Sequence, residues 1–184
     1  MIAAVSRSLR ERWPYLCLVG CLVFLDQLTK LLVDRFLPLY ESHSVVQGLV
    51  SLTYVRNRGA AFGILSDAQL PHQATLFAVI GVLALGAIIA YSASLPPRSR
   101  VPQTALALVM GGAVGNLLDR ARLGYVIDFV DVYWGPHHWP AFNVADSAIS
   151  VGVALLILDM LQSPKTPASR EIDMAEATSA GRSE

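Results

Sequence analysis

The sequence is poor in charged residues, and this scarcity restricts what kind of protein it can encode. Of its 184 residues, 15% are Asp, Glu, Lys or Arg and 54% are hydrophobic, with a mean hydropathy of +0.49. Soluble domains carry about 25% charged residues. The composition therefore excludes an ordinary soluble domain and directs attention to membrane spans. The formal net charge is zero, so the total charge gives no indication of nucleic-acid binding.

Several common catalytic and metal-binding signatures are absent as well. The sequence has no Gly-x-Ser-x-Gly motif, and no cysteine lies near a histidine. The histidines form no His-Glu-x-x-His motif, so zinc is not expected. Cys17 and Cys21 are one helical turn apart in an apolar run, where a disulfide would distort the helix. The glycines of "GGAVG" lack a following Lys-Ser/Thr, and the spacing of Gly111 and Gly115 favours close helix packing instead.

Four apolar runs are present, over residues 15–32, 70–93, 101–118 and 141–161. Each approaches the ~20 residues that a helix needs to cross ~30 Å of hydrocarbon. The first run contains "LVGC", which resembles the end of a cleaved signal peptide, but the apolar residues continue to Leu32. We therefore predict four transmembrane helices, including a retained first helix.

Lys and Arg residues indicate the orientation of these helices. Basic residues near the N-terminus, in the link after the second run and in the C-terminal segment favour cytoplasmic termini. The links 33–69 and 119–140 would then face outward. Their segments 45–57 and 125–134 are rich in Val, Tyr, Phe and Trp, which is typical of strands. The predicted fold is an all-α membrane domain over residues 1–162 with a small extracytoplasmic β-sheet on the outer membrane face, followed by a disordered cytoplasmic tail over 163–184.

Ionisable and amide side chains interrupt the predicted spans at one depth. Ionisable groups inside a span cost at least ~2.5–3.5 kcal/mol each at the helix centre, so they usually face the protein interior and have a function. With the predicted orientation, the outer ends of three spans and the link between the last two carry such residues: Asp26, Lys30, Asn116, Asp119, Arg120, Asp128, Asn143 and Asp146. Asp146 is expected about five residues inside its span, or ~7 Å deep at 1.5 Å per residue. A polar layer near the outer face follows from this spacing.

Several interpretations of the layer remain open from spacing alone. Asp26, Lys30, Asp119 and Arg120 can pair with one another and hold the helices together. Asp128 and Asp146 have fewer obvious cationic partners, and two carboxylates that lie close together share one proton, as in an aspartyl protease. A transporter or proton relay could use the same acids but would need polar groups at several depths, whereas a non-catalytic assembly factor would tolerate loss of Asp146.

Five ordered blocks resemble the lipoprotein signal peptidases (signal peptidase II). They are "DQLTK" at 26–30, "NRGAAFGIL" at 57–65, "GGAVGNLLDR" at 111–120, "VIDFVDVYW" at 126–134 and "FNVADSAISVG" at 142–152. The resemblance covers nearly everything between the first and the last predicted span. One departure is Arg58, where the family often has a small residue such as Thr.

The resemblance implies an aspartic intramembrane endopeptidase of the bacterial inner membrane, with its site near the extracytoplasmic face. Such enzymes cleave signal peptides from diacylglyceryl-modified prolipoproteins before the lipidated cysteine, and globomycin is expected to occupy the same pocket. Asp128 and Asp146 fall on the family's catalytic pair. The positions expected to bind substrate or support the site are Asp26, Lys30, Asn57, Gly59, Asn116, Asp119, Arg120 and Asn143. The resemblance implies no metal and no organic cofactor. Membrane lipid is an expected partner and nucleic acid is not. We expect a monomer.

Overall fold

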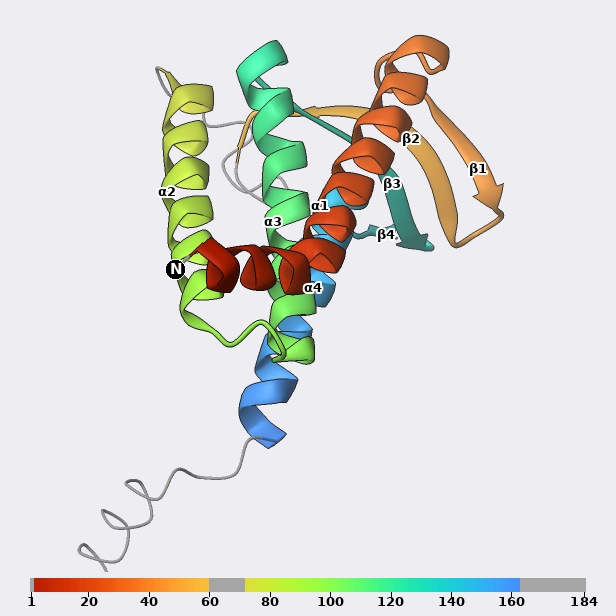
Figure 1. Cartoon of the computed structure of the whole chain (residues 1–184). Helices are drawn as coiled ribbons and strands as arrows, with labels where there is room; N and C mark the ends of the chain where they lie inside the picture. The colour runs from red at the N-terminus through yellow and green to blue at the C-terminus, as the bar shows by residue number, and fades with distance from the viewer. Residues whose placement is uncertain (1, 60–71, 163–184) are drawn as a thin grey trace, which may run out of the picture.

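A computed structural model describes the fold of residues 2–59 and 72–162 (Figure 1). Within these ranges lie α1 (Ile2–Phe36), α2 (Gln73–Ser94), α3 (Arg100–Leu123) and α4 (Val144–Gln162), each long and apolar enough to cross a membrane. The predicted four helices are therefore confirmed. The predicted tail, residues 163–184, lies outside the described residues.

Two helices are longer than hydropathy predicts. α1 begins at Ile2 rather than near residue 15, and α3 ends at Leu123 rather than near residue 118. The added segments contain Arg and Glu, so they form helix without being apolar. Pro14 lies inside α1, and the first turns of this helix lie across the direction of the rest (Figure 1). Proline removes a helical hydrogen bond and is a usual cause of such a change in direction.

Small residues bring α3 close to its neighbours. α3 packs against each of the other three helices. A Cβ atom added to Gly112 would collide with the carbonyl oxygen of Ala145 in α4, and one added to Gly152 would lie 2.6 Å from the carbonyl oxygen of Ala105. On the α1 side, a Cβ atom at Gly115 would lie 2.5 Å from Asp26 Oδ2. The predicted role of the glycine-rich segment in close helix packing is thus confirmed.

The predicted sheet is also present, as four antiparallel strands in the order β1-β2-β3-β4. These strands are β1 (Ser42–Val46), β2 (Val50–Asn57), β3 (Val126–Trp134) and β4 (His137–His138). β2 pairs with β3 from Val50 opposite Val132 to Asn57 opposite Val126, with a bulge in between. A cluster of Val33, Tyr54, Ile127 and Phe129 packs this sheet against the end of α1.

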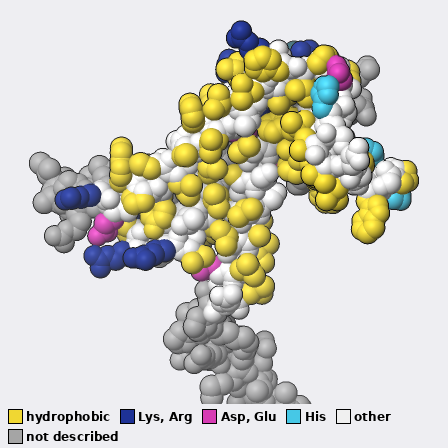
Figure 2. All heavy atoms as spheres, turned by 90° about the vertical axis from the view of Figure 1, so that its right-hand side faces the viewer, with side chains coloured by type: hydrophobic (Ala, Val, Ile, Leu, Met, Phe, Trp, Pro, Cys, Tyr) yellow, Lys and Arg dark blue, Asp and Glu magenta, His cyan; other side chains and the backbone are white. Residues whose placement is uncertain are grey.

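The distribution of polarity is the reverse of that in a soluble protein. The largest fully buried side chains are mostly polar: Lys30, Gln103, Val126, Asn143, Asp26 and Asp128. Many Leu, Ile, Val and Phe side chains on the helices are exposed instead, and hydrophobic side chains cover much of the surface in Figure 2. Such an exterior requires an apolar surrounding, which the hydrocarbon of a membrane provides.

Candidate active site

Two carboxylates, Asp128 and Asp146, are buried where the sheet meets the helices. Asp128 is the third residue of β3 and is 2% exposed, whereas Asp146 lies in the first turn of α4 and is 8% exposed. One asparagine, Asn143, contacts both. Its Nδ2 donates to Asp128 Oδ1 at 2.7 Å, and its backbone N–H donates to Asp146 Oδ2 at 3.3 Å. The pair that the sequence singles out is therefore brought to one place.

The start of α4 explains how Asn143 holds this position. Its Oδ1 accepts the backbone N–H of Asp146 at 2.9 Å while Asp146 accepts the backbone N–H of Asn143. This reciprocal pattern is a capping box, which satisfies two backbone donors at the N-terminus of a helix. α4 accordingly begins at Val144, so the prediction of about five preceding residues of helix is wrong and Asp146 is its third residue. The reason is that Phe142 pairs its backbone with Val130 of β3 instead of entering the helix.

Two further asparagines donate to the carboxylates. Asn57 Nδ2 donates to Asp128 Oδ2 at 3.0 Å, and Asn116 Nδ2 donates to Asp146 Oδ1 at 2.8 Å. Each amide has its oxygen turned to a different donor. Asn57 Oδ1 accepts the N–H of Gly59 at 2.8 Å, and Asn116 Oδ1 accepts Lys30 Nζ at 2.9 Å. Because these partners can only donate, they fix which end of each amide faces the carboxylates.

Lys30 is the centre of a buried ion network behind the carboxylate pair. Its ammonium group lies 2.9 Å from Asp26 Oδ2 and 2.9 Å from Asp119 Oδ2, and its side chain is 2% exposed. Each acid also binds backbone. Asp26 Oδ1 accepts the N–H of Ala145 at the start of α4, and Asp119 Oδ2 accepts the N–H of Ile127 in β3. The network therefore ties α1, α3, α4 and the sheet together, which is the helix-joining role that spacing left open.

Arg120 is a partial exception to that prediction. Within the described ranges it makes no ion pair with Asp26 or Asp119; its guanidinium donates to the carbonyl oxygen of Gly59 at 2.8 Å and to that of Asn116 at 3.4 Å. Arg120 lies one residue after Asp119, so the two side chains leave the helix in different directions. The contact with Gly59 fixes the backbone beside Asn57, at the end of β2.

The environment of Asp128 favours its protonated form. Burial, and after it the nearby charge of Asp146, raise the pKa of this carboxyl to about 7, although the hydrogen bonds from Asn57 and Asn143 and the charge of Lys30 lower it. Removal from water disfavours the charged carboxylate, and a second acid close by adds repulsion. A carboxyl poised near neutrality can both accept and donate a proton under physiological conditions.

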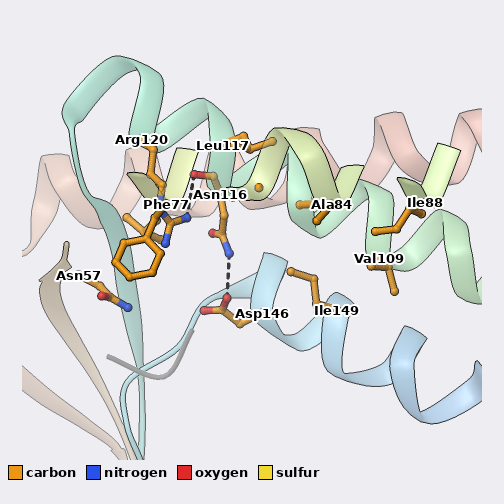
Figure 3. A pocket seen from close by; sticks show the side chains of 13 residues that line it. Asn57, Phe77, Ala84, Ile88, Val109, Asn116, Leu117, Arg120, Asp146 and Ile149 are labelled. Carbon is orange, nitrogen blue, oxygen red and sulfur yellow. Dashed lines mark hydrogen bonds between the residues drawn. The ribbon is translucent and has the colours of Figure 1, made fainter. Parts of the chain in front are cut away.

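A cavity of about 250 Å³ opens beside Asp146 (Figure 3). Asn57, Asn116, Arg120 and Asp146 lie at one end, and Asn116 points to Asp146 across it. Phe77 of α2 lies beside Arg120 at this end (Figure 3). Towards the other end the lining is apolar and comes from α2, α3 and α4: Ala84, Ile88, Val109, Leu117 and Ile149. The site therefore joins an acid-bearing end to an apolar end that suits hydrocarbon or an apolar segment.

All ten predicted site residues lie in this region, whereas other residues of the network were not predicted. Gln27 donates to Asp119 Oδ1 at 2.9 Å and to the carbonyl oxygen of Gly115 at 3.2 Å. Its only signal is its position next to Asp26 in "DQLTK". Asp131 lies apart from the pair, three residues farther along β3, where its carboxylate binds His138 Nδ1 at 2.9 Å.

Comparison with known proteins identifies the family. The family model described as signal peptidase (SPase) II matches residues 18–162. The chain belongs to the signal peptidase II family. It is 53% identical to the lipoprotein signal peptidase of Geobacter sulfurreducens over 150 residues, which cover 82% of this chain and 92% of that one. It is 42% identical to the lipoprotein signal peptidase of Pseudomonas putida, over 89% and 94% of the two chains.

A solved structure has the same fold. This structure is described as a bacterial membrane enzyme determined by the in meso method at 2.3 Å resolution. Its sequence is 31% identical to that of this chain, and the two structures superpose with a TM-score of 0.74 over 84% of this chain and 92% of that one.

Membership of the signal peptidase II family makes this protein an aspartic protease of the lipoprotein signal peptidase type. With its four apolar helices it fits a multi-pass protein of the bacterial inner membrane.

Proposed function

We propose that Asp128 and Asp146 are the catalytic dyad of this signal peptidase and hydrolyse the bond before a diacylglyceryl-modified cysteine. The observation that carries the proposal is Asn143, whose side-chain amide donates to Asp128 and whose backbone N–H donates to Asp146, so that one residue holds both carboxylates. The raised pKa of Asp128 supports one shared proton at neutral pH. Because the pair titrates jointly, that proton belongs to the dyad rather than to either acid alone.

In the proposed reaction, the charged carboxylate removes a proton from water while the protonated carboxyl gives its proton to the scissile carbonyl oxygen. The oxygen of the water forms a bond to the carbonyl carbon, which gives a tetrahedral diol. Collapse of the diol breaks the C–N bond, and the proton taken from water passes to the leaving amine. The products are a free carboxyl group on the signal peptide and a free amine on the lipidated cysteine, and the dyad recovers its single proton.

The neighbouring amides support this cycle by holding both acids still. Asn57 donates to Asp128 and Asn116 donates to Asp146, so each carboxylate retains hydrogen bonds when it is charged. Lys30, Asp26 and Asp119 lie behind these groups and bind backbone of α4 and β3. We assign them a supporting role, because their polar atoms bind one another and the backbone.

The shape of the site suits an apolar, lipid-linked substrate. The cavity places an apolar end next to Asp146, where the signal helix or the lipid of a prolipoprotein can lie (Figure 3). We propose that the polar end lies at the extracytoplasmic face, with both termini in the cytoplasm, and that globomycin competes for the same cavity. The rival function of transporter or proton relay finds no support in the comparisons, which match signal peptidases.

The test is the single-turnover cleavage rate of a lipidated prolipoprotein by purified enzyme in lipid, read as a mass shift. Asp128→Asn and Asp146→Asn keep the side-chain shape but cannot transfer the proton, so each variant is expected to lose turnover while still binding globomycin. Asp131→Asn and Asp159→Asn are matched controls and are expected to retain most activity, Asp131 because its carboxylate binds His138 instead of the asparagines of the site. Cleavage by either dyad variant within about tenfold of wild type, or ~1.4 kcal/mol in barrier, would overturn the proposal.

A further inference from the structure

A second cavity, which shares no lining residue with the cavity beside Asp146, lies between α1, α2 and α3. Its volume is about 530 Å³, and Arg12 lies at one end of it. Its large hydrophobic residues come from all three helices: Leu16, Val19, Leu85, Ile89, Met110 and Val114. The cavity therefore combines one cationic group with an apolar wall.

This cavity exists because α1 and α2 both pack against α3 but hardly touch each other. Arg12 of α1 binds the end of α2, and beyond this contact α1 leans away from α2 (Figure 1). Leu16 and Ile89, one from each of the two helices, are each 52% exposed. The gap between α1 and α2 is thus open to whatever surrounds the helices, which in a membrane is lipid.

Arg12 has no acidic partner in the described part of the chain. Its guanidinium donates to the main-chain carbonyl oxygens of Ser92, Ala93 and Leu95 at 2.8, 3.3 and 2.9 Å. A helix C-terminus carries about half a negative charge, so these bonds compensate only part of the cation. Arginine has five N–H donors, and three hydrogen bonds leave donors for another ligand. An anionic ligand would complete the set.

The surroundings of Arg12 are positive as well. Three further arginines lie at this end of the helices, and α3 begins there, so its N-terminus adds about half a positive charge: Arg10, Arg98 and Arg100. Glu11 is paired with Arg98 at 3.4 Å, and no described residue of α4, which carries Asp159, lines the cavity. In Figure 2 basic side chains gather on the left of the molecule, next to hydrophobic ones. This end of the protein therefore attracts anions.

The dimensions of the cavity suit a lipid chain and exclude a helix. Val19, Leu85 and Met110 lie nine or ten residues from the ends of their spans at Arg10, Ser94 and Arg100, or about 15 Å. That depth is half of the ~30 Å of hydrocarbon in a bilayer, which is the reach of one leaflet. A helix about 10 Å across and 15 Å long fills roughly 1,200 Å³, which is more than this cavity holds.

We propose that this cavity binds one anionic phospholipid, with its phosphate on Arg12 and an acyl chain along the apolar wall. The lipid belongs to the leaflet at the end of the helices opposite the proposed dyad. It fills the gap between α1 and α2 and thereby supports α2, whose other residues line the cavity beside Asp146. It would bind whether or not Asp128 and Asp146 form the dyad.

Native mass spectrometry of the full chain tests the proposal without a cleavage assay. Enzyme freed of lipid in a neutral detergent would be titrated with phosphatidylglycerol or phosphatidylcholine of equal chain length. The first phosphatidylglycerol is expected to bind about fivefold more tightly, which is the effect of one basic residue on an anionic lipid. Arg12→Gln should remove this preference. Arg10→Gln, the matched control at an exposed arginine outside the cavity, should retain it.

A second pair of variants tests the apolar wall and leaves the contact of Arg12 with α2 intact. Leu85→Phe fills part of the cavity and should abolish tight binding of the first lipid, whereas Leu83→Phe, at a 69% exposed position of the same helix, should bind lipid as wild type does. Equal affinity of the wild-type enzyme for the two lipids would overturn the proposal, as would equal lipid binding by the two phenylalanine variants. Displacement of bound phosphatidylglycerol by an equal concentration of glycerol 3-phosphate would also contradict it, because the ligand would then be a free phosphate.

Discussion

At the scale of single residues, the site depends on the orientation of three amides. Asn57, Asn116 and Asn143 each turn Nδ2 to a carboxylate of the pair and Oδ1 to a group that donates. An amide turned the other way would place two acceptors face to face. The donors that prevent this are two backbone N–H groups and one ammonium group, that of Lys30. We therefore infer that Lys30 acts on the site through Asn116, in addition to its ion pairs.

The first prediction concerns Asn116→Asp. This change keeps an oxygen for Lys30 but replaces the N–H that Asp146 accepts by a second carboxylate oxygen. We expect cleavage at neutral pH to fall by roughly 10- to 100-fold, because a hydrogen bond to a charged group contributes about 1.5–3 kcal/mol. Melting temperature should remain near that of wild type, since the ion network keeps all its members. The measurement combines single-turnover rates with thermal unfolding in detergent.

Lys30→Met provides the contrast for that experiment. It leaves Asp26 and Asp119 buried without their cation, which costs about 3–5 kcal/mol, so both stability and activity should fall. An Asn116→Asp enzyme with wild-type activity would show that the amide donor is dispensable. An Asn116→Asp enzyme that melts as early as Lys30→Met would show that the residue is mainly structural.

The second prediction concerns pH and stability through Asp128. Its pKa is raised to about 7 in the folded protein, mainly by burial, while an unfolded aspartate titrates near 3.9. Between these values the folded state binds the extra proton, so this carboxyl lowers the free energy of unfolding as pH rises from about 4 to about 7. Asp128→Asn cannot ionise, so it should melt higher than wild type at pH 8, by about 5 °C or more, and close to wild type near pH 4.

Melting curves of both proteins in the same detergent across this pH range measure the effect. Asp131→Asn controls for loss of any carboxylate on β3, because Asp131 is bound by the imidazole of His138 and not by the asparagines of the site. If the difference in melting temperature between Asp128→Asn and wild type did not change between pH 4 and pH 8, the pKa of Asp128 would be ordinary.

Residue patterns predicted most of the site, because intramembrane polar groups are costly and therefore few. Asp26, Asn116, Asp128 and Asp146 could be placed at one depth from helix ends alone. The choice between pairing and catalysis could not be made in this way, since spacing does not show which polar atoms meet. Gln27 was missed for the same reason, because an uncharged side chain at a span end is not unusual.

At the scale of secondary-structure elements, the separation of α3 and α4 determines the distance between Asn116 and Asp146. Gly112 faces the backbone of Ala145 in α4, one residue before Asp146, and Gly152 meets the backbone of Ala105 about two turns farther along both helices. Neither glycine leaves room for a methyl group. Backbone at both contact points would have to move to accept one, and such strain typically costs 1–3 kcal/mol.

The third prediction is that Gly112→Ala lowers both the melting temperature and the cleavage rate. The added methyl group would push α4 away and lengthen the hydrogen bond between Asn116 and Asp146. Gly86→Ala in α2 is the matched control, because no atom lies within 4 Å of the added Cβ and alanine favours helix. Thermal unfolding and single-turnover cleavage measure both effects. Equal behaviour of the two variants would mean that the contact between α3 and α4 is not tight.

Element types were predictable from apolar runs and from the β-branched and aromatic links, but element ends were not. The polar start of α1 and the end of α3 form helix because of contacts that hydropathy does not register. Arg12, for example, donates to the carbonyl oxygens of Ser92 and Leu95 at 2.8 and 2.9 Å and thereby binds the end of α2. In the sequence Arg12 is only one of several basic residues near the N-terminus.

At the scale of the whole molecule, the polar layer divides the protein into two unequal parts. The sheet and the proposed dyad lie at one end of the helices. The other end consists of helix segments with apolar exteriors and of the link from Leu95 to Ser99, which joins α2 to α3. If the sheet faces outward, substrates whose lipid lies in the outer leaflet reach Asp128 without crossing the bilayer. The opposite orientation would place the dyad in the cytoplasmic leaflet, where a translocated lipoprotein precursor has no cleavage bond.

The fourth prediction fixes this orientation by cysteine labelling in intact spheroplasts. Cys17 and Cys21, both exposed on α1, are first replaced by alanine to remove background. A cysteine at Ser42, exposed in β1, should react with a membrane-impermeant maleimide, whereas one at Ser99, between α2 and α3, should react only after the membrane is permeabilised. The reason is that an even number of spans separates the link at Ser99 from both termini, and the Arg residues beside it favour the cytoplasm. Labelling of Ser99→Cys but not Ser42→Cys before permeabilisation would place the dyad on the cytoplasmic side, and the proposed route of the substrate would then be wrong.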